Sequence, residues 1–74
     1  MARTCVVSFQ DSDGGKWSHV THASSLYEAC REALAWFADR DWHGPRPGPD
    51  AWLEVLVAGD PKRYRVRVSR IMKA

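Results

Sequence analysis

The sequence lacks a long apolar run and has few cysteines, and each shortage excludes a class of protein. No stretch approaches the roughly 18 apolar residues that a membrane-spanning helix needs, so no membrane association is expected. The two cysteines, Cys5 and Cys30, allow at most one disulfide and no disulfide framework. The first residues show no secretory signal, because residues 4–10 have the pattern of a strand. We therefore expect a reducing, cytoplasmic location.

The short length limits the number of domains, and the small net charge limits what can be said of nucleic-acid binding. With 74 residues the chain has room for one domain, expected to span residues 1–74. A domain of this size buries only about 60–65% of the surface that its unfolded chain exposes, and a partner often adds stability. The net charge of +2 does not by itself indicate nucleic-acid binding. The cations are unevenly placed, however, because six of the eleven follow Asp60: Lys62, Arg63, Arg65, Arg67, Arg70 and Lys73.

Alternating apolar residues near the start of the chain predict a β-hairpin. In residues 4–10 the two-residue period of a strand brings three side chains to one face, namely Cys5, Val7 and Phe9. An Asp-Gly turn follows at residues 11–15, where glycine tolerates positive φ. Residues 16–22 then predict a second, more polar strand.

A capping pattern predicts one helix after this hairpin. Ser25 precedes Glu28 by three residues, so the serine hydroxyl can accept the Glu28 amide while the glutamate carboxylate accepts the Ser25 amide. Gly44 and Pro45 are expected to end the helix. Residues at helical spacing form one apolar stripe: Leu26, Cys30, Ala33, Leu34 and Phe37.

Two further strands are predicted after a stiff, proline-rich connector at residues 45–49. Residues 52–58 and 63–71 alternate as strands do, with a turn between them. Their inward side chains are Leu53, Val55, Val57, Tyr64, Val66 and Val68. The outward row on the last strand includes Arg63, Arg65 and Arg67, spaced about 6.6–7 Å apart.

These elements predict an α+β domain of ββαββ type, a four-stranded, mainly antiparallel sheet with one helix packed on one face. The strand order 2-1-3-4 makes every pair of neighbours antiparallel, and the order 2-1-4-3 stays open. One helix covers only one face of four strands. The other face is expected to carry the three arginines together with four apolar side chains: Val6, Trp52, Leu56 and Ile71.

No combination of residues predicts a catalytic, cofactor or metal site. His19 and His22 are three residues apart on a strand and point to opposite faces, whereas zinc sites use close ligand pairs. Cys5 and Cys30 fall on inward faces, where a free thiol packs as a small apolar side chain. No carboxylate pair shares an inward face for acid–base chemistry. A nucleophile is not expected either, because Cys30 is predicted to be buried and Ser25 is engaged in the cap. An enzyme and a small-molecule substrate are therefore not expected.

Five motifs that extend over nearly the full chain carry a resemblance. They are Val7-x-Phe9-x-Asp11, Ser25-Leu26-Tyr27-Glu28-Ala29, Ala33-Leu34, Pro47-Gly48-Pro49 and Leu53-Glu54-Val55-x-Val57. Together they resemble a group of uncharacterised short bacterial proteins of mobile-element type. The motifs are structural, so this resemblance carries over no catalytic residue. Residues 5–37 are also similar to HicB-type antitoxins, although this chain lacks their third strand before the helix and adds a basic strand at its end.

The arginine row allows three interpretations. Arg63, Arg65 and Arg67 could be solvated charges that prevent edge-to-edge aggregation. They could also surround the apolar cluster of Val6, Trp52, Leu56 and Ile71 as the rim of a protein interface. A third reading is phosphate binding beside Trp52 as a stacking platform. The sequence favours a small non-enzymatic interaction module that forms a homodimer or docks on another protein. A nucleic-acid-binding accessory protein is the alternative.

Overall fold

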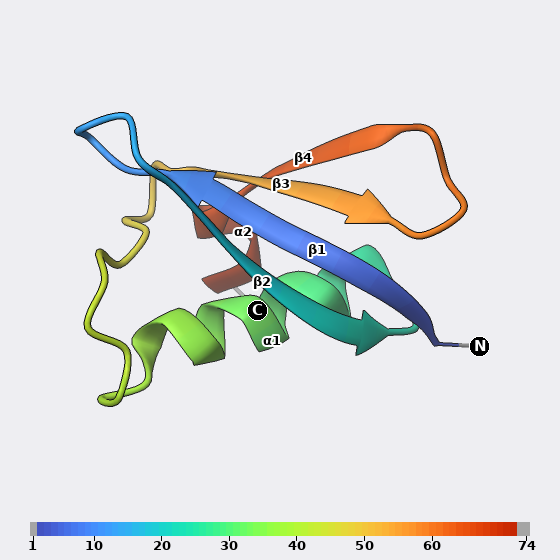
Figure 1. The fold of residues 1–74 in the computed structure, drawn as a ribbon, viewed down its shortest axis with the longest axis horizontal. Coiled ribbons are helices and arrows are strands. Elements are labelled where there is room, and N and C mark those ends of the chain that lie inside the picture. Colours follow the sequence, from blue (N-terminus) through green and yellow to red (C-terminus); the bar gives the residue numbers. More distant parts are fainter. Residues whose placement is uncertain (1, 73–74) are drawn as a thin grey trace.

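The computed structural model describes residues 2–72 and contains four strands and two helices. In chain order these are β1 (Arg3–Gln10), β2 (Lys16–Ala23), α1 (Leu26–Ala38), β3 (Trp52–Val57), β4 (Arg63–Arg67) and α2 (Val68–Met72). The strands form one antiparallel sheet in the order β2-β1-β3-β4 (Figure 1). The predicted ββαββ fold is thus confirmed, with a short second helix added. Of the two strand orders that the sequence left open, the structure has 2-1-3-4.

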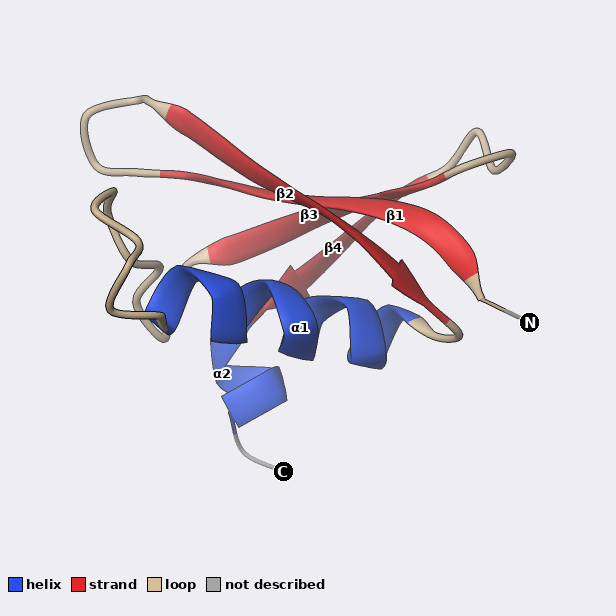
Figure 2. Ribbon diagram, turned by 60° about the horizontal axis from the view of Figure 1, so that its bottom comes forward, coloured by secondary structure: helices blue, strands red, loops and turns tan. Residues whose placement is uncertain are grey.

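The hydrophobic core lies between the sheet and the two helices, which cover the same sheet face (Figure 2). Phe9 of β1 and Phe37 of α1 meet edge to face within it, with ring centroids 4.8 Å apart. Neither helix within residues 2–72 is long and apolar enough to cross a membrane. The buried apolar residues are Cys5, Val7, Phe9, Ala23, Ala29, Cys30, Ala33, Phe37, Leu53, Val55, Val68 and Ile71.

The start of α1 agrees with the predicted cap except in one bond. The hydroxyl of Ser25 accepts the amide of Glu28 at 3.1 Å. The Glu28 carboxylate accepts the amide of Ser24 at 3.3 Å, and not that of Ser25 as predicted. The bond from the Glu28 carboxylate thus reaches one residue further before the helix than in a standard capping box, and it fixes the backbone that leads into the helix.

The helix ends at Ala38, well before the predicted stop at Gly44 and Pro45. Asp39 has an extended backbone, and its carboxylate accepts the amide of Asp41 at 2.9 Å. This local bond competes with the helical pattern, as aspartate side chains often do. The early end lets Trp42 fold back, where its ring packs 5.2 Å from that of Phe37.

The last predicted strand, residues 63–71, is also shorter than expected. It ends at Arg67, because the chain bends into α2 at Val68. The amides of Val68 and Ser69 donate to the carbonyls of Ala51 and Pro49 at 3.0 and 2.9 Å, which holds the bend against the loop before β3. The bend carries Ile71 to the helix side of the sheet, where it is 8% exposed. The prediction that Ile71 lies on the uncovered face is therefore wrong.

Asp11 holds the first hairpin closed. Its carboxylate accepts the amides of Asp13 and Gly15 at 3.0 and 2.7 Å and the indole N–H of Trp17 at 3.0 Å. Gly14 takes the positive φ of 86° that this turn requires. The bond from Trp17, followed by that from Gly15, holds the pKa of Asp11 below its ordinary value.

Candidate functional site

The sheet face opposite the helices, called the open face below, is covered by no other element of residues 2–72 (Figure 2). The strand register aligns Val20, Val6, Leu56 and Arg63 in one row across all four strands. Trp52 lies further along β3, opposite Arg67. Val20, Trp52 and Leu56 are 57%, 43% and 37% exposed, which is high for apolar side chains of this size.

Three of the four predicted apolar residues are brought together on this face. Val6, Trp52 and Leu56 lie there, whereas Ile71 belongs to the core. Sequence reasoning missed Val20, because β2 reads as a polar strand. Two features of the sequence could have revealed it. Val20 lies two residues after Ser18, so both side chains point to the same face, and the five-residue turn fixes a register in which Val20 is directly opposite Val6.

The predicted arginine row is also on the open face, and two of its members contact Trp52. The guanidinium carbons of Arg65 and Arg67 lie 4.9 and 4.6 Å from the Trp52 ring centroid. Cation–π contacts of this kind hold the ring and the cations together at a surface.

The arginines have no acidic partner in the part of the chain that the structure describes. The single ion pair among residues 2–72 joins Lys16 and Glu54 at 3.7 Å. Glu54 lies directly opposite Arg65 in the register but is engaged with Lys16 instead. Among the strand residues of the open face, four cations therefore face one carboxylate: Lys16, Arg63, Arg65 and Arg67 against Glu54.

Two shallow hollows meet at Trp52. The first encloses about 550 Å³ and is lined on its polar side by Lys16, Asp50, Glu54 and Arg65. The second encloses about 650 Å³ and is lined by Trp52, Arg65, Val66, Arg67, Ser69 and Arg70. This second concavity, the Arg–Trp hollow, has three guanidinium groups and no carboxylate in its lining. The sequence did not predict Arg70 as a contact residue, because only the bend into α2 brings it to the same hollow as Arg65 and Arg67.

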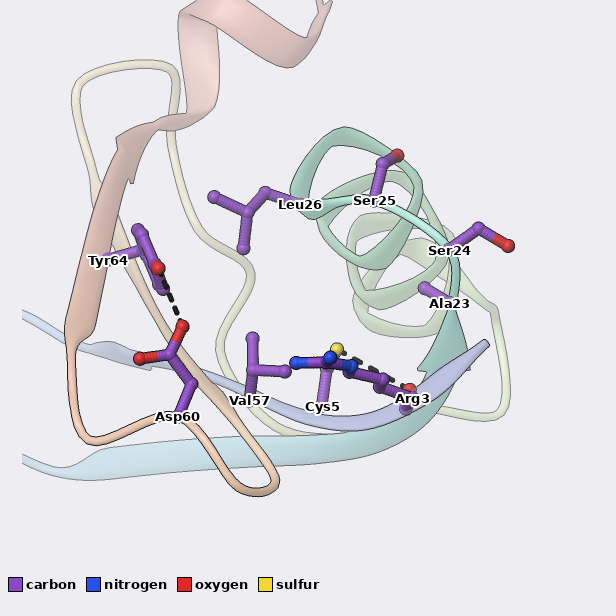
Figure 3. A pocket seen from close by; sticks show the side chains of 9 residues that line it. All are labelled: Arg3, Cys5, Ala23, Ser24, Ser25, Leu26, Val57, Asp60 and Tyr64. Carbon is purple, nitrogen blue, oxygen red and sulfur yellow. Dashed lines mark hydrogen bonds between the residues drawn. The ribbon is translucent and has the colours of Figure 1, made fainter. Parts of the chain in front are cut away.

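A separate cleft of about 370 Å³ lies at the start of α1 (Figure 3). Its apolar lining includes Cys5, Leu26 and Val57. The Tyr64 hydroxyl donates to the Asp60 carboxylate at 2.7 Å, which lowers the pKa of Asp60 and raises that of Tyr64. The two polar groups satisfy each other, so neither is prepared to act as a base or a nucleophile at neutral pH.

The possible metal ligands are dispersed. Within residues 2–72, no three histidine, cysteine or acidic side chains lie close enough together to hold a metal ion. His19 stacks on Trp36 with centroids 4.8 Å apart, and His22 lies 3.1 Å from the Thr4 hydroxyl. Cys30 is a buried free thiol, and burial raises its pKa to about 11.

No family model, curated protein or solved structure matches this chain. The resemblances to mobile-element proteins and to HicB-type antitoxins stay predictions. Evidence for function therefore comes from the chemistry of the open face.

Proposed function

We propose that this protein is a non-enzymatic accessory module that binds single-stranded nucleic acid on its open face. One observation carries the proposal: Arg63, Arg65 and Arg67 form a regular row beside exposed Trp52, with no carboxylate partner within residues 2–72. Alternate residues of a strand are about 6.6–7 Å apart, close to the distance between successive phosphates on an extended single strand. Such a row can neutralise the backbone while a base stacks on the aromatic ring.

Arg65 and Arg67 occupy the Trp52 ring in the free protein, but this does not prevent a base from stacking there. A cation–π contact at an exposed site stabilises by about 0.5–1 kcal/mol. Stacking of a base on an aromatic side chain contributes about 1–3 kcal/mol. A base can therefore replace a guanidinium on the ring with a net gain, and the released guanidinium can then form paired hydrogen bonds with a phosphate.

The shape of the surface favours a single strand over a duplex. Neither helix of residues 2–72 lies on the open face, so no helix is placed there to enter a groove (Figure 2). Unstacked bases, by contrast, can lie flat against a sheet with an exposed aromatic side chain.

The proposal is tested by the salt dependence of binding to a fluorescent single-stranded oligonucleotide. Affinity should fall linearly on a log–log plot as salt rises, and Arg65→Gln should flatten the slope by about 0.7. Arg31→Gln is the matched control, because Arg31 also stacks on an aromatic ring, that of Tyr27, but on α1. The absence of binding at low salt would disprove the proposal, and so would an equal effect of the two variants.

Self-association through the open face, which the sequence favours, is a second candidate. The observation behind it is the aligned apolar row of Val20, Val6 and Leu56. Two copies could pack these rows against each other, with the arginines at the rim near Glu54 of the second copy. This candidate comes second for two reasons. Ile71 lies in the core and adds no apolar area to the open face, and the excess of cations on the open face would make two copies repel each other.

Salt separates the two candidates. Screening reduces the repulsion between two cationic faces, so a dimer should be strengthened by salt whereas nucleic-acid binding is weakened. Light scattering at micromolar concentration, in low and high salt, gives the mass. A dimer should dissociate on Leu56→Lys, and a monomeric mass at both salt concentrations would exclude it.

A cytoplasmic location is part of the same proposal. Cys5 and Cys30 are both free and buried, as is usual for thiols in a reducing compartment. Labelling the tagged protein inside the cell and measuring its thiol state would test this placement.

A further inference from the structure

We propose that the Arg–Trp hollow is a site for a nucleoside monophosphate group, which stacks its base on Trp52 and places its phosphate among Arg65, Arg67 and Arg70. This inference rests on the proposed nucleic-acid function and specifies which part of the open face recognises a phosphate monoester. The group can come from the 5′-phosphorylated end of a strand or from a free mononucleotide. The two sources present the same chemistry to the hollow.

The lining of the hollow has the composition that such a ligand needs. Three arginines and Ser69 line it together with the exposed Trp52, and no acidic residue is present in the lining. Its volume of about 650 Å³ falls within the range of small-ligand sites, about 300–1,000 Å³. The first hollow, across Trp52, contains Asp50 and Glu54 and is less suited to an anion.

The fold holds these groups in place. The amides of Val68 and Ser69 donate to the carbonyls of Ala51 and Pro49, respectively, and Ala51 directly precedes Trp52. Val68 and Ile71 anchor α2 in the core on either side of exposed Arg70. Arg70 therefore extends from an anchored helical turn and lines the same hollow as Trp52.

The charge of the hollow selects the type of phosphate. An internal phosphodiester carries one negative charge, whereas a phosphate monoester carries about 1.5–2 at neutral pH. Arginine forms paired, charge-assisted hydrogen bonds with phosphate oxygens, and three such groups match the larger charge better. Arg31, which lies on α1 over the Tyr27 ring and does not line the hollow, serves as the comparison.

The test uses the full chain, isotope-labelled for NMR, titrated with adenosine 5′-monophosphate and with adenosine. We expect the nucleotide to bind at least about tenfold more tightly than the nucleoside. Shifts should concentrate on the Trp52 indole and the amides of Arg65, Arg67, Ser69 and Arg70. Arg70→Gln should remove most of the preference for the nucleotide, whereas Arg31→Gln, on α1, should leave it unchanged. Both arginines are exposed, and the spectrum of each variant also reports whether it is folded.

Equal binding of nucleotide and nucleoside would overturn the inference, as would equal effects of the two substitutions. A second experiment compares a 5′-phosphorylated oligonucleotide with its 5′-hydroxyl form. Tighter binding of the phosphorylated form, lost in Arg70→Gln, would support recognition at strand ends. If both forms bind equally with a normal salt slope and the nucleotide shows no preference, the monoester site is wrong and the proposed function stands. If no oligonucleotide binds at low salt, the proposed function itself fails.

Discussion

Several polar side chains of this domain support the fold through defined hydrogen bonds. Asp11 closes the first hairpin, and the Thr21 hydroxyl donates to Glu32 where β2 meets α1. On the open face, by contrast, the guanidinium groups of Arg65 and Arg67 both lie over the exposed ring of Trp52. At the scale of single residues, the meeting of two arginines on one exposed aromatic ring is what distinguishes the open face.

Cys30 is expected to be unreactive in the folded protein. Its side chain is fully buried, and burial raises the pKa of the thiol to about 11, so almost no thiolate forms at neutral pH. Labelling by a thiol reagent, located by mass spectrometry, should proceed only as fast as the protein opens. Denaturant should make Cys5 and Cys30 react rapidly. Fast native labelling of Cys30 would contradict this packing and reopen the question of an enzyme.

Acidification should weaken the first hairpin through Asp11. Hydrogen bonds from Trp17 and Gly15 lower the pKa of this carboxyl in the folded state, so its contribution is present above the ordinary aspartate pKa, about 3.9. That contribution is lost as the pH falls through the lower, folded pKa. Asp60, which accepts from Tyr64, shifts in the same direction.

The Trp17 indole N–H gives a direct measurement of this effect. Its NMR shift should titrate with a midpoint below the ordinary aspartate value, and unfolding midpoints should decline below about pH 4. Asp11→Asn should remove the indole titration and part of the pH dependence. Asp13→Asn is the matched control, because Asp13 joins the turn through its backbone amide. An indole titration unchanged in Asp11→Asn would show that another group causes it.

The two helices depend on different sources of stability. α1 has 13 residues, a local cap and an apolar stripe that packs on the sheet. α2 has only five residues, fewer than an isolated helix needs to be stable in water. It therefore forms because Val68 and Ile71 are buried and because two amides find carbonyl partners in the loop before β3.

At the scale of one element, Ser25→Ala should destabilise α1. The substitution removes the acceptor for the Glu28 amide, which typically costs about 0.5–2 kcal/mol in the free energy of unfolding. Chemical denaturation measures the change. Ser24→Ala is the control, because Ser24 contributes its amide and not its hydroxyl. If the midpoint does not move in Ser25→Ala, this cap does not stabilise the helix.

At the scale of the whole molecule, the last described residues complete the core. Ile71→Ala should lower the free energy of unfolding by about 2–4 kcal/mol, because it leaves a cavity between α2 and the core. Met72→Ala tests the neighbouring position, where the side chain is 68% exposed and truncation should have little effect. Denaturation of the two variants side by side gives the answer. Similar midpoints for both would mean that α2 does not anchor the core.

Most of the architecture could be predicted because its signals are local. Alternation over two residues marked the inner faces of β1 and β3, and the Ser25–Glu28 pair marked the start of α1. The preference for antiparallel neighbours favoured the strand order 2-1-3-4 and left 2-1-4-3 open, and the structure has the first of these. The same alternation placed the arginine row with Val6, Trp52 and Leu56 on the uncovered face.

By itself, the sequence determined the fold class, the two faces of the sheet and the arginine row beside Trp52. Only the tertiary structure decided the end of β4, the burial of Ile71 and the place of Arg70 in the Arg–Trp hollow. A short apolar segment such as residues 68–72 fits a strand or a helical turn equally well when seen alone. The choice is made by partners far away in the sequence, since the carbonyls of Pro49 and Ala51 accept the amides at the bend and the core accepts Val68 and Ile71.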